Sequence, residues 1–137
     1  MTFANHWEEE ILDHVFGRGS YTPPTIYVGL HKGTSALSSD STTPVEPSAA
    51  SYNRIQVSAW SRSGSTITNT SDIEFDVAEE DWTTGSDEIK SVVLWNHATA
   101  AVVADNYLAF GSVSTSKPIQ EDDQAKILAG QLSITLD

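Results

Sequence analysis

The chain begins with hydrophobic residues at helical spacing. Six of them form one stripe: Phe3, Trp7, Ile11, Leu12, Val15 and Phe16. This spacing predicts an amphipathic helix over residues 3–16. Asn5 is its expected N-cap, with Glu8 as the capping-box partner, and Gly17 and Gly19 are expected to end it. We expect one apolar face of this helix to lie on the rest of the protein or on a neighbouring subunit.

After the helix, hydrophobic and polar residues alternate with period two, which is typical of strands. Alternation, together with a near-continuous apolar run in residues 88–97, predicts strands within residues 25–30, 52–60, 66–78, 88–97, 102–114 and 126–136, about seven or eight in all. A Ser-, Thr- and Pro-rich stretch, residues 34–51, is expected to be a long loop. These elements predict a mainly β fold, an antiparallel β-sandwich or jelly roll with one N-terminal helix. No linker interrupts residues 1–137, so we expect a single domain.

The most regular alternation pairs an apolar face with an acidic one. Its members are Ile73, Phe75 and Val77 on one face and Asp72, Glu74 and Asp76 on the other. A cation could bridge these carboxylates with help from Glu79 or Asp81, but the stretch lacks the ligand spacing of an EF-hand loop. We therefore interpret it as an exposed acidic face, which also discourages edge-to-edge aggregation of the sheet.

Charge narrows the range of partners. Nineteen acidic residues face seven basic ones, a net charge of −12. With no basic patch to neutralise phosphates, we expect no nucleic-acid partner and no anionic membrane partner. The acidity fits simple solubility, a basic partner surface, or a high-salt environment that screens repulsion between carboxylates. The absence of cysteine excludes disulfides and thiolate metal sites. We see no signal peptide and no membrane-spanning run.

His31 and Lys32, between Gly29 and Gly33, are the first candidates for chemistry. A catalytic histidine needs a nucleophile to activate and a group to orient it, and the sequence has no Gly-x-Ser-x-Gly elbow. We therefore expect no catalytic residue. We interpret His31 and Lys32 as residues at the end of the first strand, suited to a subunit contact. A small hydrolase that uses His31 is the alternative.

The candidate metal ligands, sugar-stacking aromatics and glycosylation site also have structural interpretations. His6, Glu10 and His14 lie on one side of the predicted helix but lack a His-Glu-x-x-His motif, so we expect a solvated face and no metal. Four aromatic residues are suited either to stacking on sugars or to core packing, which we favour: Trp60, Trp82, Trp95 and Tyr107. The triplet starting at Asn69 matches a glycosylation sequon, a weak signal without a secretion signal.

Four segments together resemble a known family. They are "TIYVGLHKG" at residues 25–33, "SYNRIQV" at 51–57, "IKSVVLWNHATAA" at 89–101 and "KPIQEDDQAKILAGQLSITLD" at 117–137. Over nearly its whole length the chain resembles small virion structural proteins of tailed phages and archaeal tailed viruses, labelled tail-fibre-like or capsid-associated. The resemblance implies a sandwich or jelly-roll protein that forms symmetric oligomers on the virion. It implies no catalytic residues and no cofactor.

From the resemblance we expect a non-enzymatic virion structural protein. It would form a homo-oligomer that decorates the capsid or forms the base of a vertex turret, in contact with the major capsid protein or a tail or turret protein. Two alternatives stay open: a tail-tip or tail-fibre-associated subunit, and a glycan- or receptor-binding module. The acidity adds the hypothesis of a halophilic virus, such as one that infects a haloarchaeon.

Overall fold

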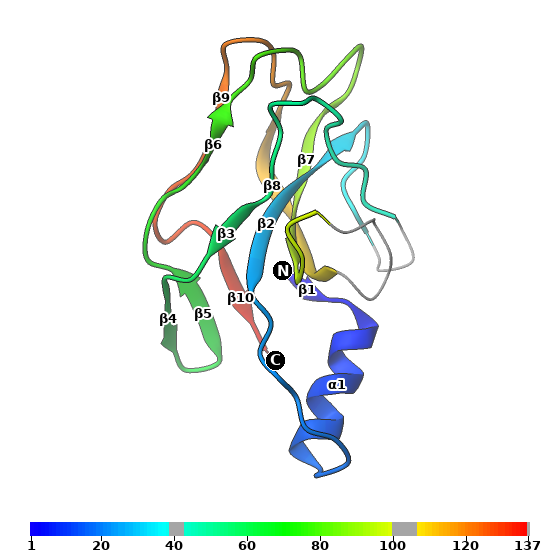
Figure 1. Cartoon of the computed structure of the whole chain (residues 1–137), viewed down its shortest axis with the longest axis vertical. Coiled ribbons are helices and arrows are strands. Elements are labelled where there is room, and N and C mark those ends of the chain that lie inside the picture. Colours follow the sequence, from blue (N-terminus) through cyan, green and yellow to red (C-terminus); the bar gives the residue numbers. More distant parts are fainter. Residues whose placement is uncertain (39–42, 100–106, 137) are drawn as a thin grey trace.

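The computed structural model describes residues 1–38, 43–99 and 107–136. Within these ranges it contains one helix and ten strands (Figure 1). In chain order they are β1 (Thr2–Phe3), α1 (Asn5–Val15), β2 (Ile26–Gly33), β3 (Ile55–Val57), β4 (Trp60–Ser63), β5 (Thr66–Asn69), β6 (Ile73–Val77), β7 (Glu88–Trp95), β8 (Tyr107–Lys117), β9 (Gln124–Ile127) and β10 (Ser133–Thr135).

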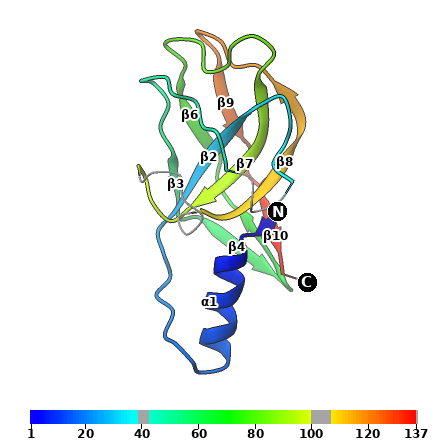
Figure 2. The same ribbon diagram turned by 90° about the vertical axis from the view of Figure 1, so that its right-hand side faces the viewer.

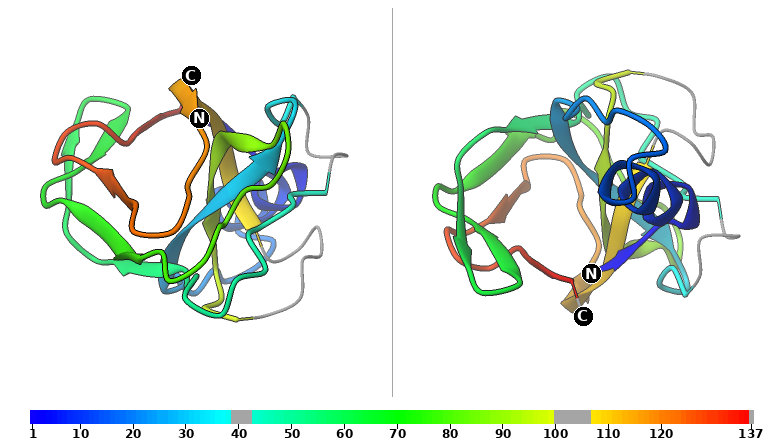
Figure 3. Two further views of the ribbon diagram at one scale, coloured as in Figure 1. Left: turned by 90° about the horizontal axis from the view of Figure 1, so that it is seen from above. Right: turned by 90° about the horizontal axis from the view of Figure 1, so that it is seen from below.

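The strands form three antiparallel sheets. Five strands pair in the order β1-β8-β7-β2-β3, three in the order β10-β5-β4, and β6 pairs with β9. Figure 3 shows the two smaller sheets on one side of the five-stranded sheet and α1 on the other. The prediction of a mainly β, antiparallel fold with one N-terminal helix is confirmed.

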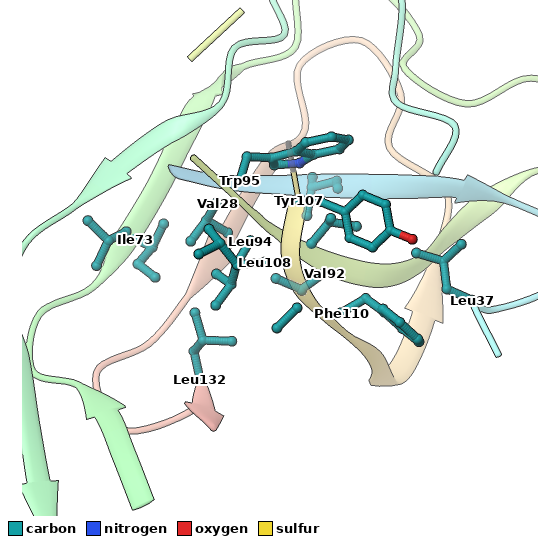
Figure 4. Packing of buried hydrophobic residues seen from close by; sticks show 14 of the residues in the cluster. Val28, Leu37, Ile73, Val92, Leu94, Trp95, Tyr107, Leu108, Phe110 and Leu132 are labelled. Carbon is teal, nitrogen blue, oxygen red and sulfur yellow. The ribbon is translucent and has the colours of Figure 1, made fainter. Parts of the chain in front are cut away.

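The core lies on both faces of the five-stranded sheet. Val28, Leu94 and Leu108 point toward Ile73 and Leu132 of the smaller-sheet side (Figure 4). The opposite face is also covered, so every residue of β7 from Ser91 to Trp95 is buried. A strand buried on both faces needs a continuous apolar run rather than alternation, which explains the "VVLW" of this strand.

Helix α1 begins differently from the sequence prediction. Its N-cap is Ala4, in an extended conformation, and the predicted Asn5 cap is wrong. Pairing with β8 decides this, because the Ala4 N–H donates to the Leu108 carbonyl at 2.9 Å. Ala4 is therefore the last extended residue, and its own carbonyl accepts from the N–H of Trp7 at 2.9 Å and of Glu8 at 3.2 Å.

The predicted end of α1 is confirmed. Gly17 has a φ of 70°, which favours glycine, and its N–H donates to the His14 carbonyl at 3.3 Å. The Arg18 N–H donates to the Asp13 carbonyl at 2.8 Å. This pair of bonds is a Schellman motif, which satisfies carbonyls at the helix end. It also places Arg18 directly beyond the last helical turn.

Several predicted strand boundaries are wrong. The first strand continues to Gly33, so His31 and Lys32 lie within β2 and pair with β7 rather than at a strand end. Residues 52–60, 66–78 and 126–136 each contain parts of two strands that belong to different sheets. The chain crosses between sheets there, and alternation alone does not report a change of sheet. The predicted start of the strand at residue 102 lies outside the described residues.

Candidate functional site

His31 is buried, and both of its ring nitrogens bind backbone. Nδ1 accepts the Val45 N–H at 2.8 Å, and Nε2 donates to the Ser35 carbonyl at 3.2 Å. This arrangement fits the neutral ring with its proton on Nε2, and burial lowers the pKa of His31 below its ordinary value. Since both nitrogens are engaged, the ring has no lone pair to serve as a general base. The prediction of His31 as a subunit contact is wrong, because the ring is buried and anchors a loop.

The same face of the sheet holds the loop at further points. His31 pairs with Ser91 of β7, and the Ser91 Oγ accepts the Leu37 N–H at 3.0 Å. The Lys32 N–H donates to the Val45 carbonyl at 2.8 Å. Alternation along β2 explains the arrangement, because Gly29 and His31 point away from the face that carries Val28 and Leu30. The described parts of the predicted loop are thus tied to the sheet.

A buried ion pair between Glu46 and Arg54 holds the C-terminal part of the loop over residues 34–51. Arg54 Nη2 lies 2.6 Å from Glu46 Oε2, and the two side chains are only 5% and 13% exposed. Arg54 Nε also donates to both carboxylate oxygens at 3.1 Å, and its guanidinium lies over the Trp95 ring. The planar guanidinium of arginine allows bidentate pairing and flat stacking on an aromatic ring together, which the ammonium of lysine cannot reproduce.

Tyr52 links the cluster of Glu46, Arg54 and Trp95 to β2. Its hydroxyl donates to Glu46 Oε1 at 2.7 Å and accepts the Leu30 N–H at 2.8 Å. Burial, with the nearby Glu46 carboxylate, raises the pKa of Tyr52 far above its ordinary value. The phenol therefore stays protonated as a structural donor. Tyr52 and Arg54 belong to the sequence motif "SYNRIQV", which carries part of the family resemblance. No local pattern in the sequence indicated Glu46 as their partner.

Gly29 provides the space that this cluster occupies. A Cβ atom at Gly29 would lie 2.6 Å from Glu46 Oε1, 2.7 Å from Trp95 Nε1 and 3.0 Å from the Tyr52 hydroxyl. Real Cβ contacts essentially never come this close, so a side chain would displace the carboxylate or the indole. Glycine is therefore required at position 29 by the close packing of the loop on β2.

The acidic face of β6 binds a lysine of the same chain. Lys126 Nζ lies 2.8 Å from Asp72 Oδ2 and 2.6 Å from Glu74 Oε1, and these carboxylates raise the pKa of Lys126. Asp72, Glu74 and Asp76 are exposed as predicted, whereas Val77 is half-exposed because the β6–β9 register shifts before it. The ammonium of Lys126 thus lies where we considered a bridging cation.

The helix candidates His6 and His14 contact other residues of their own chain. His14 Nδ1 accepts the Tyr21 N–H at 3.3 Å, and the His6 ring lies against Trp7. Across the described residues, no group of three or more His, Asp or Glu side chains lies close enough to hold a metal ion. Nor does any described helix have the length and apolar character needed to cross a membrane.

Three of the four candidate aromatics are core residues. Trp82, Trp95 and Tyr107 are fully buried, while Trp60 is only partly buried. The Trp82 ring packs edge-on against Tyr52, with 5.2 Å between centroids, and its Nε1 donates to a serine hydroxyl. Buried rings cannot stack on a sugar, so the preference for core packing is confirmed for these three.

Asn69, the first residue of the sequon, is a buried anchor. Its Nδ2 donates to the Leu128 carbonyl at 3.0 Å and the Ser71 carbonyl at 2.9 Å. Its Oδ1 accepts the Leu132 N–H at 2.9 Å. The amide nitrogen that glycosylation would modify is therefore already bonded inside the fold. These bonds join β5 to the segment that precedes β10.

A groove of about 650 Å³ lies between β8 and the segment that joins β9 to β10. Its lining includes Gly111, Val113, Thr115, Ile127, Gln131 and Ser133. β8 pairs with β1 only at Ala109 and Phe110, so the rest of that edge has no strand partner among the described residues. The lining contains no aromatic, histidine or carboxylate side chain. It therefore offers neither a stacking platform for sugars nor an acid–base pair.

Three exposed large apolar side chains lie together at the end of α1. Leu12, Val15 and Phe16 are 55%, 69% and 75% exposed, although the sequence places them on the predicted apolar stripe. Trp7, on the other side of the helix, is buried and packs edge-on against Tyr21. Figure 2 shows α1 extending beyond one end of the sheets.

The fold and these contacts define a structural β-protein. Its candidate polar residues, such as His31 and Asn69, bind other parts of the same chain. A family model described as Podophage GP4 fiber I protein gp80 matches residues 2–135, and the chain belongs to this family. It is accordingly a virion component, and its family implies contacts with other virion proteins. A search of curated proteins found no match.

Proposed function

We propose that this chain is a non-enzymatic structural subunit of a tail fibre, which forms a homo-oligomer and contacts other virion proteins. The observation that carries the proposal is the match to a fibre-protein family over residues 2–135. Fibre association was an alternative in the sequence analysis, and the family description favours it over capsid decoration or a turret base.

The candidate residues support a structural role. His31 binds backbone through both nitrogens, Asn69 is fully engaged, and Lys126 neutralises the β6 carboxylates. Catalysis requires a positioned nucleophile or a titratable group aimed at a substrate, and these side chains are instead aimed at their own chain. The exposed apolar end of α1 supports assembly, because such patches mark interaction sites.

Labelling of intact virions tests the proposal. Antibodies against the protein, imaged with gold on native particles, are expected to mark the tail fibres. Label at capsid faces or vertices would overturn the proposal. It would instead support capsid decoration or a turret base. A glycan panel addresses the receptor-binding alternative, for which we expect no binding.

A further inference from the structure

His31 binds the loop after β2 at two separate points of the chain. Its Nε2 donates to the Ser35 carbonyl at 3.2 Å, and its Nδ1 accepts the Val45 N–H at 2.8 Å. We call the described residues from one contact to the other the strap: residues 35–38 and 43–45. One buried side chain of β2 therefore holds both parts of the strap against the five-stranded sheet.

Two further hydrogen bonds hold the strap on β2 and β7, and both are neutral. The Ser91 Oγ accepts the Leu37 N–H at 3.0 Å, and the Lys32 N–H donates to the Val45 carbonyl at 2.8 Å. Hydroxyl and backbone groups do not titrate near neutral pH, whereas an imidazole changes charge between about pH 5 and 8. Among these contacts, those of His31 are the pH-sensitive ones.

The strap has a fixed boundary on each side. β2 continues to Gly33, and Glu46, directly after the strap, binds Arg54 at 2.6 Å in a buried ion pair. Carboxylate and guanidinium groups ordinarily keep their charges between about pH 5 and 8. A movement of the strap is therefore confined to the residues between these boundaries and leaves the pairing of β2 with β7 in place.

Protonation of the His31 ring would set two hydrogen-bond donors against each other. Nδ1 holds the electron pair that accepts the Val45 N–H, so a proton on Nδ1 turns this acceptor into a donor. The two N–H groups would then face each other across 2.8 Å. The bond to the Ser35 carbonyl survives, because Nε2 donates in both charge states. Acid therefore breaks the contact between the ring and Val45.

The protonated ring would also be a cation in a buried position. His31 is only 6% exposed, and a buried charge is costly unless an opposite charge pairs with it. The charged side chains of β2, of the start of β7 and of the residue after the strap already form ion pairs: Lys32 with Asp87 at 3.7 Å, Lys90 with Glu88 at 2.6 Å, and Arg54 with Glu46 at 2.6 Å. Asp87 favours the cation, but burial outweighs it and lowers the pKa of His31.

We propose that His31 is an acid-sensitive latch: protonation of its ring releases the strap from β2 and β7 while the sheets stay folded. The two neutral bonds would not keep the strap over a buried cation, because their groups bond to water when they open. Leu37, now 5% exposed and part of the buried cluster (Figure 4), would become exposed. The latch uses contacts within one chain, so it does not depend on where the protein lies in the virion.

Hydrogen exchange of the full chain, measured amide by amide with NMR, tests the latch. The exposed ring of the open state has the ordinary pKa of 6.5, so the open state gains population as pH falls below this value. The protection factors of the Val45 and Leu37 N–H groups should therefore fall by about three- to thirtyfold between pH 7.5 and 5. A decrease smaller than about threefold at Val45 would overturn the latch.

Low concentrations of urea separate release of the strap from unfolding of the whole chain. Urea acts in proportion to the surface that an opening exposes, and a local opening exposes little. Exchange at Val45 and Leu37 should therefore change little with urea below the unfolding transition. A urea dependence as steep as that of global unfolding would overturn the latch.

Two variants assign the pH dependence to the ring. His31→Gln removes the titrating group, so the pH dependence at Val45 should disappear. Ser91→Ala is the matched control, because it removes a strap contact that does not titrate. It should lower the protection of Leu37 at every pH and keep the pH dependence at Val45. A pH dependence that survives His31→Gln would overturn the latch.

The unmodified chain gives a readout that needs no variant. Ring ¹⁵N shifts should show the proton of His31 on Nε2 at pH 7.5, and His31 should titrate at a lower pH than the exposed His97 ring. A His31 ring that titrates together with His97, or above it, would show that burial does not oppose its charge and would overturn the latch.

Discussion

The guanidinium of Arg54 lies over the indole ring of Trp95, with 3.7 Å between Cζ and the ring centroid. Its Nε–Nη2 edge binds the Glu46 carboxylate, and Nη1 donates to the His97 carbonyl at 2.8 Å. Arg54, which directly precedes β3, thereby connects the loop after β2 to the end of β7. We expect this contact to contribute strongly to stability, because a charge left unpaired in a buried site is costly.

Arg54→Met keeps much of the side-chain volume but leaves Glu46 without its cation. We expect a loss of about 3–5 kcal/mol in the free energy of unfolding, measured by urea denaturation. Arg62→Met is the matched control, because Arg62 is exposed and should change stability by no more than about 0.5 kcal/mol. Equal losses in the two variants would contradict a special role for the buried pair.

Gly29→Ala tests the close packing of the loop on β2. The added Cβ would meet the Glu46 carboxylate and the Trp95 indole at less than 3.0 Å, so we expect a loss of about 1–3 kcal/mol from overpacking. Gly19→Ala is the control, since its Cβ would meet only an ordinary contact at 3.9 Å. Thermal melting of both variants measures the difference in stability. A Gly29→Ala variant as stable as the unmodified protein would show that Glu46 and Trp95 can shift to accept the added Cβ at little cost.

His31 makes stability depend on pH in a defined direction. Burial lowers its pKa in the folded state below 6.5, although the nearby Asp87 opposes the shift. The unfolded chain therefore takes up the proton first as pH falls. The stabilisation is complete above about pH 6.5 and is lost as pH falls through the folded pKa, with a slope of at most about 1.4 kcal/mol per pH unit.

Urea denaturation between pH 7.5 and 5 measures this slope. His31→Gln should be less stable at pH 7.5 and should lose the dependence, whereas His97→Gln, which changes an exposed ring, should retain it. A slope that persists in His31→Gln would assign the effect to another group.

Asn69→Ala removes three hydrogen bonds at once and leaves the Leu132 N–H without its acceptor in a buried site. We expect a loss of at least about 1–3 kcal/mol. Asn53→Ala, at an exposed position, is the control. Hydrogen exchange should show faster exchange at Leu132 in the Asn69 variant, and unchanged protection there would argue against the anchor role.

The high-salt hypothesis predicts a melting temperature that keeps rising in molar KCl. Screening is nearly complete by ~0.5 M, where the Debye length is only a few ångströms. A further rise between 0.5 and 3 M would therefore indicate adaptation of the acidic surface to high salt. A melting curve that is flat over this range would refute the hypothesis.

The sequence by itself determined the elements whose pattern is local. Helical spacing identified α1, and Gly17 marked its end. Alternation identified the apolar faces of β2 and β6, and a near-continuous apolar run identified β7. These features could be predicted because period and burial are properties of neighbouring residues. The resemblance of four segments likewise led to a virion protein family, which the family match confirmed.

Only the tertiary structure decided which distant residues meet. Glu46 pairs with Arg54, Lys126 reaches Asp72, and His31 holds Val45 because the chain path brings them together. The sequence had suggested His31 as a subunit contact at a strand end and the β6 carboxylates as an exposed acidic face, because composition reports neither burial nor partners. The same path divides the apolar stripe of α1, because the helix extends beyond one end of the sheets, buries Trp7 and leaves Leu12 and Phe16 to solvent (Figure 2).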